Sequence, residues 1–253
     1  MGGQDAVAAI VNPVKGKNPP DPGPVVLMVS NAADLQRLAE AMAPDTRDRR
    51  DILMSRLFCP VDTDRCGALI GPVIGAPYAV ILFEKLIAWG VRRLLYFGWC
   101  GAIVPDVGIG DLVLAEGSVA DDGTSRHYGQ KEHAVVRSSD GLTRKIGRAL
   151  DTGGLNFHRG LVWTTDAIFR ETGQKLMKFQ EAGALAVEME LSALFSVARF
   201  RGIEAAGVLA VSDELASLKW RPGFGDRRFK QTRRNVCEVL AGLCRSFQGD
   251  LPP

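Results

Sequence analysis

Short blocks of consecutive apolar residues alternate along the chain with longer stretches in which apolar residues recur every three or four positions. The blocks are typical of buried strands, and the stretches are typical of helices that pack one face against a sheet. The blocks that predict strands are 24–30, 68–74, 93–97, 111–115, 160–163, 184–188 and 204–211. The stretches that predict helices are 35–42, 78–89, 141–150, 191–202 and 227–247, with one more helix ending at 179–182. This alternation favours the α/β class, with a mostly parallel sheet covered by helices on both faces.

Two regions of the chain lie outside this regular pattern. Residues 1–24 are rich in Gly, Pro, Asn and Lys, so we expect a flexible N-terminal arm followed by one domain over 25–250. The longest uncharged run, 66–83, contains two Gly/Pro interruptions and predicts a strand, a turn and a helix start, not a membrane span. The N-terminus lacks the basic and apolar pattern of a secretory signal, so a cytoplasmic location is expected.

The composition excludes several classes of protein. Of 253 residues, 46% are apolar and 24% charged, which excludes a mostly disordered chain, a collagen-like repeat and a disulfide mini-protein. The 31 basic and 29 acidic residues leave a net charge of +2, too small an excess to indicate a nucleic-acid or membrane surface. None of the five cysteines forms a CxxC pair and the three histidines form no HExxH motif, so we expect no metal site.

Two carboxylates flank a methionine at the end of the strand 184–188. Glu188 and Glu190 would lie on the same side of an extended strand and could accept hydrogen bonds from vicinal sugar hydroxyls. If the chain turns into the helix at Leu191, they diverge, and Glu190 lies in the first helical turn, where a negative charge is favourable. The local pattern leaves both alternatives open.

A second acidic group follows the apolar strand 204–211. Open α/β sheets bind ligands beyond the carboxyl ends of their strands, where Ser212, Asp213 and Glu214 stand. Asp213 could act as a general acid if burial raises its pKa. Alternatively, Ser212 or Asp213 caps a helix.

Three further segments carry weaker signals. The glycines of 98–101 follow a strand and could form an anion nest, although a tight turn with no ligand is the commoner explanation. Residues 122–128, including His127, have the polar mixture of a binding loop or of a plain surface turn. The basic stretch 219–234 predicts either a solvated helix face or a lid that reaches a phosphate.

Several of these segments form ordered motifs. The motifs are Gly98-x-x-Gly101-Ala102, Gly110-Asp111, Asp122-Gly123-Thr124-Ser125-x-His127-Tyr128, Thr164-Thr165-Asp166, Val187-Glu188-Met189-Glu190 with Ser192-Ala193-Leu194, and Val211-Ser212-Asp213. In this order, over about residues 25–247, they resemble the nucleoside phosphorylase superfamily, which includes uridine phosphorylases, hexameric purine nucleoside phosphorylases and methylthioadenosine nucleosidases. The resemblance implies a single-domain three-layer α/β sandwich around a central mixed, partly closed sheet.

The resemblance also implies an activity and its residues. The expected enzyme cleaves a nucleoside N-glycosidic bond through an oxocarbenium-like state, giving free base and ribose 1-phosphate, with phosphate as co-substrate and no cofactor. Glu190 would hold the ribose hydroxyls, and Asp213 would protonate or orient the base. The other expected substrate-binding residues are Met189, Glu188, Ile168, Phe169, Gly98, Trp99, Cys100, Ser212 and His127.

Because of two departures from the family pattern, the sequence does not decide between phosphorolysis and its alternatives. The phosphorylase loop Gly-Asp-Pro-x-Arg is replaced by residues 30–34, Ser-Asn-Ala-Ala-Asp, and an Arg and a Thr near Gly98 are replaced by Tyr96 and Trp99. The lost arginines are those that would grip phosphate bidentately. A hydrolytic nucleosidase is therefore an alternative, although Asp34 is the only acid near the place where nucleosidases activate water. A non-catalytic nucleoside-binding module is an alternative of another class.

The resemblance also has implications for the base of the substrate and for the oligomeric state. No counterpart of the uracil-reading insertion follows Phe169, which favours a purine or an unusual base. Family members are dimers or trimers of dimers in which a neighbour completes each site. Arg47, Arg49 and Arg50 stand where such a neighbour's arginine would lie, so we expect a homodimer or homohexamer. If an arginine of the last helix reaches the anion, the candidates are Arg227 and Arg228.

Overall fold

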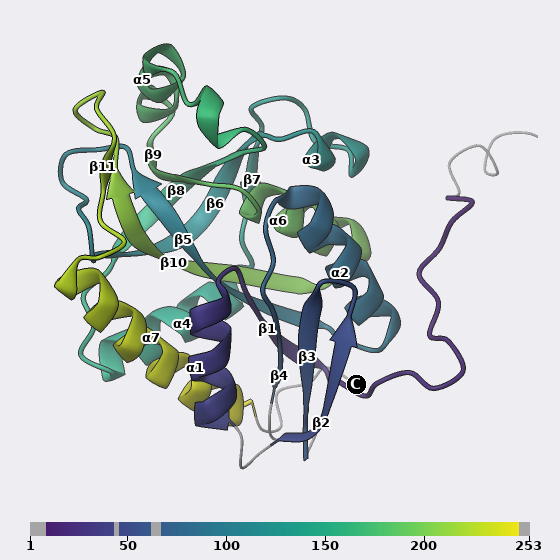
Figure 1. Cartoon of the computed structure of the whole chain (residues 1–253). Coiled ribbons are helices and arrows are strands. Elements are labelled where there is room, and N and C mark those ends of the chain that lie inside the picture. Colours follow the sequence, from purple (N-terminus) through teal and green to yellow (C-terminus); the bar gives the residue numbers. More distant parts are fainter. Residues whose placement is uncertain (1–8, 43–45, 62–66, 248–253) are drawn as a thin grey trace, which may run out of the picture.

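The computed structural model describes residues 9–42, 46–61 and 67–247. Its strands, in chain order, are β1 (Val25–Val29), β2 (Thr46–Ile52), β3 (Ser55–Pro60), β4 (Ala68–Gly71), β5 (Arg93–Ala102), β6 (Leu112–Asp121), β7 (Val135–Arg137), β8 (His158–Thr165), β9 (Ala184–Glu188), β10 (Glu204–Glu214) and β11 (Arg221–Pro222). Its helices are α1 (Ala32–Met42), α2 (Ala76–Ala88), α3 (Thr124–His127), α4 (Asp140–Thr152), α5 (Gly173–Glu181), α6 (Leu191–Arg201) and α7 (Arg227–Arg245), with a 3₁₀ turn at Ile168–Arg170. Strands and helices therefore alternate over most of the chain (Figure 1).

Five strands close into a small barrel. β5 pairs in parallel with β10, β10 antiparallel with β6, β6 parallel with β8, β8 parallel with β9, and β9 antiparallel with β5. Beyond β5 the sheet continues as an open extension through β1, β4, β3 and β2. The mixed, partly closed sheet is confirmed, and the mostly parallel sheet expected from the apolar pattern is wrong. Strands covered on both faces are apolar whatever their direction, so the pattern does not encode strand polarity.

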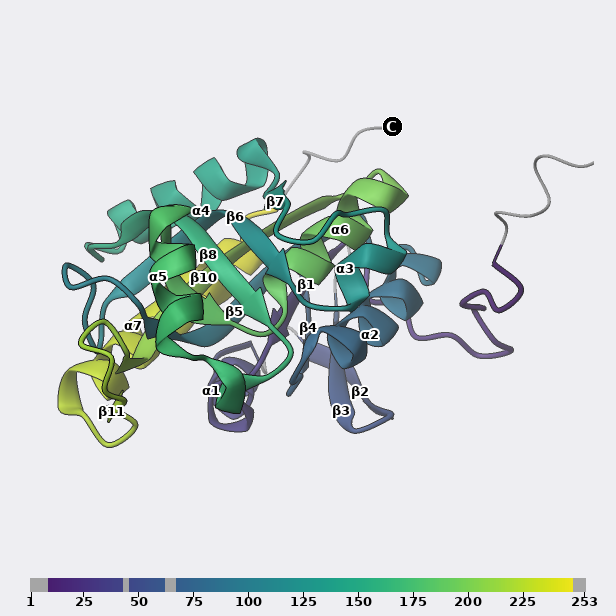
Figure 2. The same ribbon diagram turned by 90° about the horizontal axis from the view of Figure 1, so that it is seen from above.

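Helices cover the sheet in two groups, which Figure 2 shows from above. α1, α4 and α7 pack on one face around a core that includes Leu38, Leu150 and Phe229 from the helices, with Leu27 and Phe97 from the strands. α2 and α6 pack on the other face, around a core to which they contribute large aromatic and aliphatic side chains. Residues of both faces of the central strands are thus excluded from water, which is the main source of stabilisation for such a sheet.

β5 is longer than its apolar block predicts. It runs through Gly98 and Gly101 to Ala102 as continuous strand, so the tight turn considered for this segment is absent from it. A Cβ at Gly98 would lie 2.6 Å from Cε1 of Tyr96, so glycine is required there for the tyrosine ring to lie along the strand. The glycines serve close packing at the point where β5 leaves β1 and joins the barrel.

The hairpin of β2 and β3 has no counterpart among the expected strands. β2, with the sequence Thr-Arg-Asp-Arg-Arg-Asp-Ile, is the last strand of the sheet extension and carries five charged residues. A strand at a sheet edge needs no apolar block, and charges there discourage pairing with other chains. Its position follows from pairing with β3, a tertiary interaction.

Residues 9–24 form neither helix nor strand, yet they contact the domain. The carbonyl of Lys15 accepts a hydrogen bond from the indole of Trp89 at 3.2 Å, and that of Asn18 accepts one from Arg50 at 2.9 Å. The flexible arm and the domain boundaries stay predictions. Across the described residues, no helix combines the length and the apolar character needed to cross a bilayer.

Candidate active site

The carboxylate of Glu188 lies buried where β9 ends and α6 begins. It accepts hydrogen bonds from the backbone N–H groups of Glu190 at 2.7 Å and Leu191 at 2.8 Å, and a short one from the hydroxyl of Thr164. Because a helix leaves its first N–H groups without intrahelical partners, Glu188 stabilises the start of α6. The helix-terminal role considered for Glu190 therefore belongs to Glu188.

Glu190, also 4% exposed, faces a different set of donors. One carboxylate oxygen accepts from the hydroxyl of Tyr96 at 2.7 Å, and the other from the backbone N–H of Gly75 at 2.5 Å. Burial and then the charges of Glu190 and Glu188 raise the pKa of Tyr96, so its hydroxyl stays a donor. An acceptor-only carboxylate held at both oxygens is suited to bind two adjacent hydroxyl groups.

Glu188 and Glu190 interact electrostatically because both are buried. Burial and then the charge of Glu190 raise the pKa of Glu188 to about 8, while burial raises the pKa of Glu190. Two adjacent carboxylates in a dry site share protons, so at neutral pH the pair carries less than its full double negative charge. A ligand that donates hydroxyls to the pair stabilises its ionised form.

Asp213 lies half-buried near the end of β10, next to an irregularity in its pairing with β5. One carboxylate oxygen accepts from the hydroxyl of Ser212 at 2.6 Å, and the other from the indole N–H of Trp220 at 2.9 Å. Cys100 lies between this group and the paired glutamates: burial and then the charges of Asp213 and Glu188 raise the pKa of its thiol. The structure thus brings Glu188, Cys100 and Asp213 to one end of the barrel.

The segment after β8 borders the same end of the barrel. Ile168 is 52% and Phe169 96% exposed, so neither is packed into a pocket within the single chain. Glu171, which belongs to no motif of the sequence, is half-buried and follows them closely in the chain. Burial and then the charge of Asp213 raise its pKa to about 7, and Lys175 opposes this shift. No local motif distinguishes Glu171 from a surface glutamate, because its environment is made by the distant Asp213.

A buried ion pair joins Asp34, at the start of α1, to Arg233 of α7. Asp34 accepts from Nε of Arg233 at 2.9 and 3.0 Å and from the indole of Trp99 at 2.7 Å. The guanidinium of Arg233 lies 4.3 Å from the Trp99 ring centroid and donates to Asn31 at 3.4 Å. Trp99 therefore lies on the α1 and α7 side of β5, away from Tyr96, and helps to hold the two helices together.

The remaining expected residues are less closely associated with the carboxylates. Gly98 lies beneath the Tyr96 ring, Met189 is half-buried between the two glutamates in sequence, and His127 is exposed at the end of α3. Arg228 forms a short ion pair with Asp111, and Arg227 is exposed. Neither arginine contacts Asp213 in this structure.

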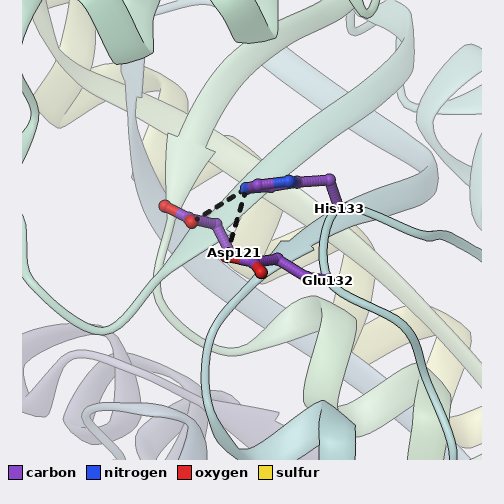
Figure 3. A group of neighbouring side chains, drawn as sticks. All are labelled: Asp121, Glu132 and His133. Carbon is purple, nitrogen blue, oxygen red and sulfur yellow. Dashed lines mark hydrogen bonds and ion pairs between the residues drawn. The ribbon is translucent and has the colours of Figure 1, made fainter.

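A separate polar cluster lies at the end of β6. Asp121, Glu132 and His133 bring one ligand atom each within 4.8 Å of the others (Figure 3). Lys175 donates to Asp121 at 2.7 Å, and the ammonium nitrogen of Lys178 lies 3.1 Å from Nδ1 of His133. Two ammonium groups against the cluster oppose a divalent cation, so its chemistry is that of an ion-pair network.

Comparisons with known proteins show what this chain is similar to. Residues 25–248 match the family model described as "Phosphorylase superfamily". Guanosine phosphorylase from Halorubrum lacusprofundi is 32% identical over 199 residues, which cover 79% of this chain and 78% of that protein. A DeoD-type purine nucleoside phosphorylase from Yersinia enterocolitica is 28% identical over 76% of this chain and 80% of its own length.

Solved structures show the same fold. Purine nucleoside phosphorylase from Toxoplasma gondii, in complex with immucillin-H, superposes with a TM-score of 0.76 at 19% identity, covering 94% of this chain and 97% of that one. Uridine phosphorylase from Vibrio fischeri superposes with a TM-score of 0.73 at 23% identity, covering 90% and 93%. The expected resemblance, its fold and the expected class of enzyme, a pentosyltransferase of nucleoside phosphorylase type, are confirmed.

Proposed function

Since this chain belongs to the phosphorylase superfamily, we propose that it cleaves a purine nucleoside with phosphate, giving free base and ribose 1-phosphate. The observation that carries the proposal is the buried Glu190 carboxylate, which Tyr96 and Gly75 hold at the end of the barrel that also contains Asp213. Guanosine is the first substrate to test, because the guanosine phosphorylase relative is 32% identical over most of this chain.

In the proposed reaction, the sugar lies on the glutamate pair. Glu190 accepts hydrogen bonds from the two ribose hydroxyls, and Glu188 holds the peptide that carries Glu190. As the bond between the sugar and the base breaks, positive charge develops on the ribose ring, and the nearby carboxylates stabilise it. A phosphate oxygen then bonds to the anomeric carbon, and the base leaves with the bond's electron pair and a proton.

Phosphate binding in this chain must differ from the pattern of its relatives. Arg233 is the buried arginine nearest to the replaced loop, but Asp34 engages its Nε and one terminal nitrogen. This engagement favours hydrolysis as a second candidate reaction. Against hydrolysis, Asp34 is fully buried in the ion pair and is not available to activate water, and residues 30–39 contain no other acid for that task.

One experiment distinguishes the candidates. Guanosine, inosine, adenosine and uridine are incubated with the protein in phosphate buffer and in phosphate-free buffer, and bases and sugars are separated by chromatography. Release of base with ribose 1-phosphate, only in phosphate, supports the proposal. Release of free ribose at the same rate without phosphate identifies a nucleosidase. Binding of a nucleoside with no turnover in either buffer identifies a non-catalytic module.

We also propose that two copies of the chain associate. Large apolar side chains are exposed at the tip of the β2–β3 hairpin, on α2 and just before it, and on α6. The hairpin tip and α2 are joined by a 3.0 Å hydrogen bond between Met54 and Tyr78, and Phe200 of α6 packs on Tyr128. The exposed residues are Leu53, Met54, Ile74, Ile81 and Phe200. Exposed large apolar side chains on elements that contact one another are typical of an interface.

The assembly has a direct test. Light scattering at micromolar protein gives a dimer or larger mass if the face is covered by a second copy, and the substitution Ile81→Glu then lowers the mass to that of a monomer. A monomeric wild-type protein contradicts this proposal.

The arginines of β2 differ as candidates to reach a neighbouring copy. Arg49 is exposed and is the better candidate, since Arg50 pairs with Asp48. The side chain of Arg47 lies outside those that the structure describes. The cytoplasmic location stays a prediction.

A further inference from the structure

Tyr96 of β5 lies directly against the carboxylate of Glu190. Its hydroxyl donates to one oxygen of Glu190 at 2.7 Å, and the two residues are only 1% and 4% exposed. The other oxygen accepts from the N–H of Gly75 at 2.5 Å. The side chain of Ser30 forms a hydrogen bond to the hydroxyl of Tyr96. Since Ser30 supplies a proton to the Tyr96 oxygen, the proton of Tyr96 itself is directed to Glu190.

The donors to Glu190 come from separate parts of the fold. Tyr96 belongs to a central strand, whereas Gly75 lies in the turn that precedes α2, and a backbone hydrogen bond from Met189 reaches the carboxylate as well. A carboxylate that is held from several directions cannot rotate freely about its side-chain torsions. The orientation of Glu190 is therefore set before any ligand binds.

The charge of Glu190 is held by neutral donors. Burial raises its pKa, hydrogen bonds from Tyr96, Gly75 and Met189 lower it, and no cationic side chain of the described residues contributes to this balance. A hydrogen bond to an ionised group is stronger than one between neutral groups, and its loss in a buried site leaves the charge poorly compensated. The hydroxyl of Tyr96 is therefore a large part of what stabilises the ionised glutamate.

The sequence of β5 leaves room for this contact. Tyr96 and Gly98 are two residues apart on an extended strand, so both point to the same face. A Cβ at Gly98 would lie 2.7 Å from the hydroxyl oxygen of Tyr96 and 2.6 Å from its Cε1. A side chain at position 98 would thus push the end of the ring away from Glu190.

We propose, on the premise of the proposed function, that Tyr96 is a positioning residue for the sugar, which acts through Glu190 and holds its carboxylate ready for the vicinal hydroxyls of ribose. A group that is already oriented loses less conformational freedom when the ligand binds. It also keeps the sugar in the geometry that the reaction needs. Where the family pattern has an arginine, this chain carries a neutral donor that is directed to the glutamate.

The test measures kcat/KM in phosphate for guanosine and for 2′,3′-dideoxyguanosine, which lacks both hydroxyls, with wild type and Tyr96→Phe. The substitution should lower kcat/KM by about tenfold for guanosine and by less than about threefold for the dideoxynucleoside, which has no hydroxyl for Glu190 to hold. Tyr128→Phe is the matched control, because it removes a tyrosine hydroxyl from the carboxylate of Glu84, a contact of 2.9 Å. The control should leave the preference for guanosine over the dideoxynucleoside unchanged.

Calorimetric titration with the two nucleosides in phosphate-free buffer gives a second readout, in which Tyr96→Phe should weaken the binding of guanosine more than that of the dideoxynucleoside. Equal losses on both nucleosides, or unchanged values for guanosine, overturn the proposal, because a purely structural tyrosine does not distinguish the sugars. If Tyr96→Phe does not fold, Gly98→Ala displaces the same hydroxyl and carries the same expectation. Absence of any cleavage by wild type would contradict the proposed function, whereas unequal losses of binding would still support the role of Tyr96.

Discussion

In the proposed reaction the candidate site has two ends: the sugar end, formed by Glu188 and Glu190, and the base end, around Asp213 and Phe169. The two ends differ in how they are built. At the sugar end, Glu188 and Glu190 are each 4% exposed, and each carboxylate accepts from groups that belong to strands or to the start of a helix. At the base end, Phe169 is 96% and Trp220 62% exposed, and the acidic groups stand on or beside loops. A fixed end suits ribose, which all nucleosides share, and a loop-borne end suits the base, which varies.

Among the substitutions that test this difference, removal of the Glu188 carboxylate should have the largest effect on stability. Glu188→Ala leaves two buried N–H groups and a buried hydroxyl without their acceptor, and each such loss costs about 1–3 kcal/mol. We expect the free energy of unfolding to fall by about 3–5 kcal/mol, measured by urea denaturation. Glu188→Gln, which keeps an acceptor, should cost less. Equal stability of the alanine variant and wild type would show that the sugar end is not the rigid one.

Glu190→Gln should separate binding of the sugar from stability. A neutral amide loses charge-assisted hydrogen bonds, each worth about 1.5–3 kcal/mol, so kcat/KM should fall by about tenfold to a hundredfold. The melting temperature should fall only moderately, because the amide oxygen can still accept from Tyr96, while the amide NH2 group cannot accept from the N–H of Gly75. Steady-state kinetics and a thermal melt on the same preparation check both expectations. Unchanged kinetics would leave the carboxylate with a purely structural role.

The raised pKa of Glu188 predicts how the free energy of unfolding depends on pH. Because burial raises the pKa of Glu188 to about 8, the folded state binds more protons than the unfolded state above about pH 4.5. This contribution to stability is fully present below that pH and is lost as the pH rises through 8. The free energy of unfolding from urea titrations at pH 5, 6.5 and 8 should fall by about 3 kcal/mol over this range, and Glu188→Gln should flatten the trend.

The base end should tolerate substitution better. Trp220→Phe removes the indole donor to Asp213 but keeps an aromatic ring on a side chain that is 62% exposed. We expect KM for the nucleoside to change by about threefold to tenfold, since one hydrogen bond to a charged group is lost, and the melting temperature to stay within about 2 °C. Trp89→Phe, whose indole donates to Lys15 on another face, is the matched control. A large loss of stability at Trp220 would remove the contrast between the two ends.

The sugar end could be predicted from the sequence to a greater extent than the base end. Val187-Glu188-Met189-Glu190 is a contiguous motif at the end of an apolar block, so its position was evident before the structure. The donors to Glu190 were not evident, since Tyr96 and Gly75 lie 94 and 115 residues away along the chain. At the base end, Glu171 depends on Asp213, which is distant in sequence, and no local pattern predicts such a pair.

By itself, the sequence determined the buried strands and the helices that cover them, because burial imposes periodicities that local composition records, and the ordered motifs identified the family. Tertiary structure alone decided the direction in which strands pair, since apolar strands look alike in either direction. It also determined the role of Asp34, a possible water-activating acid in the sequence, which is a buried partner of Arg233, 199 residues away. Charges and hydrogen bonds act through space, so their partners are chosen by the fold, not by the neighbouring sequence.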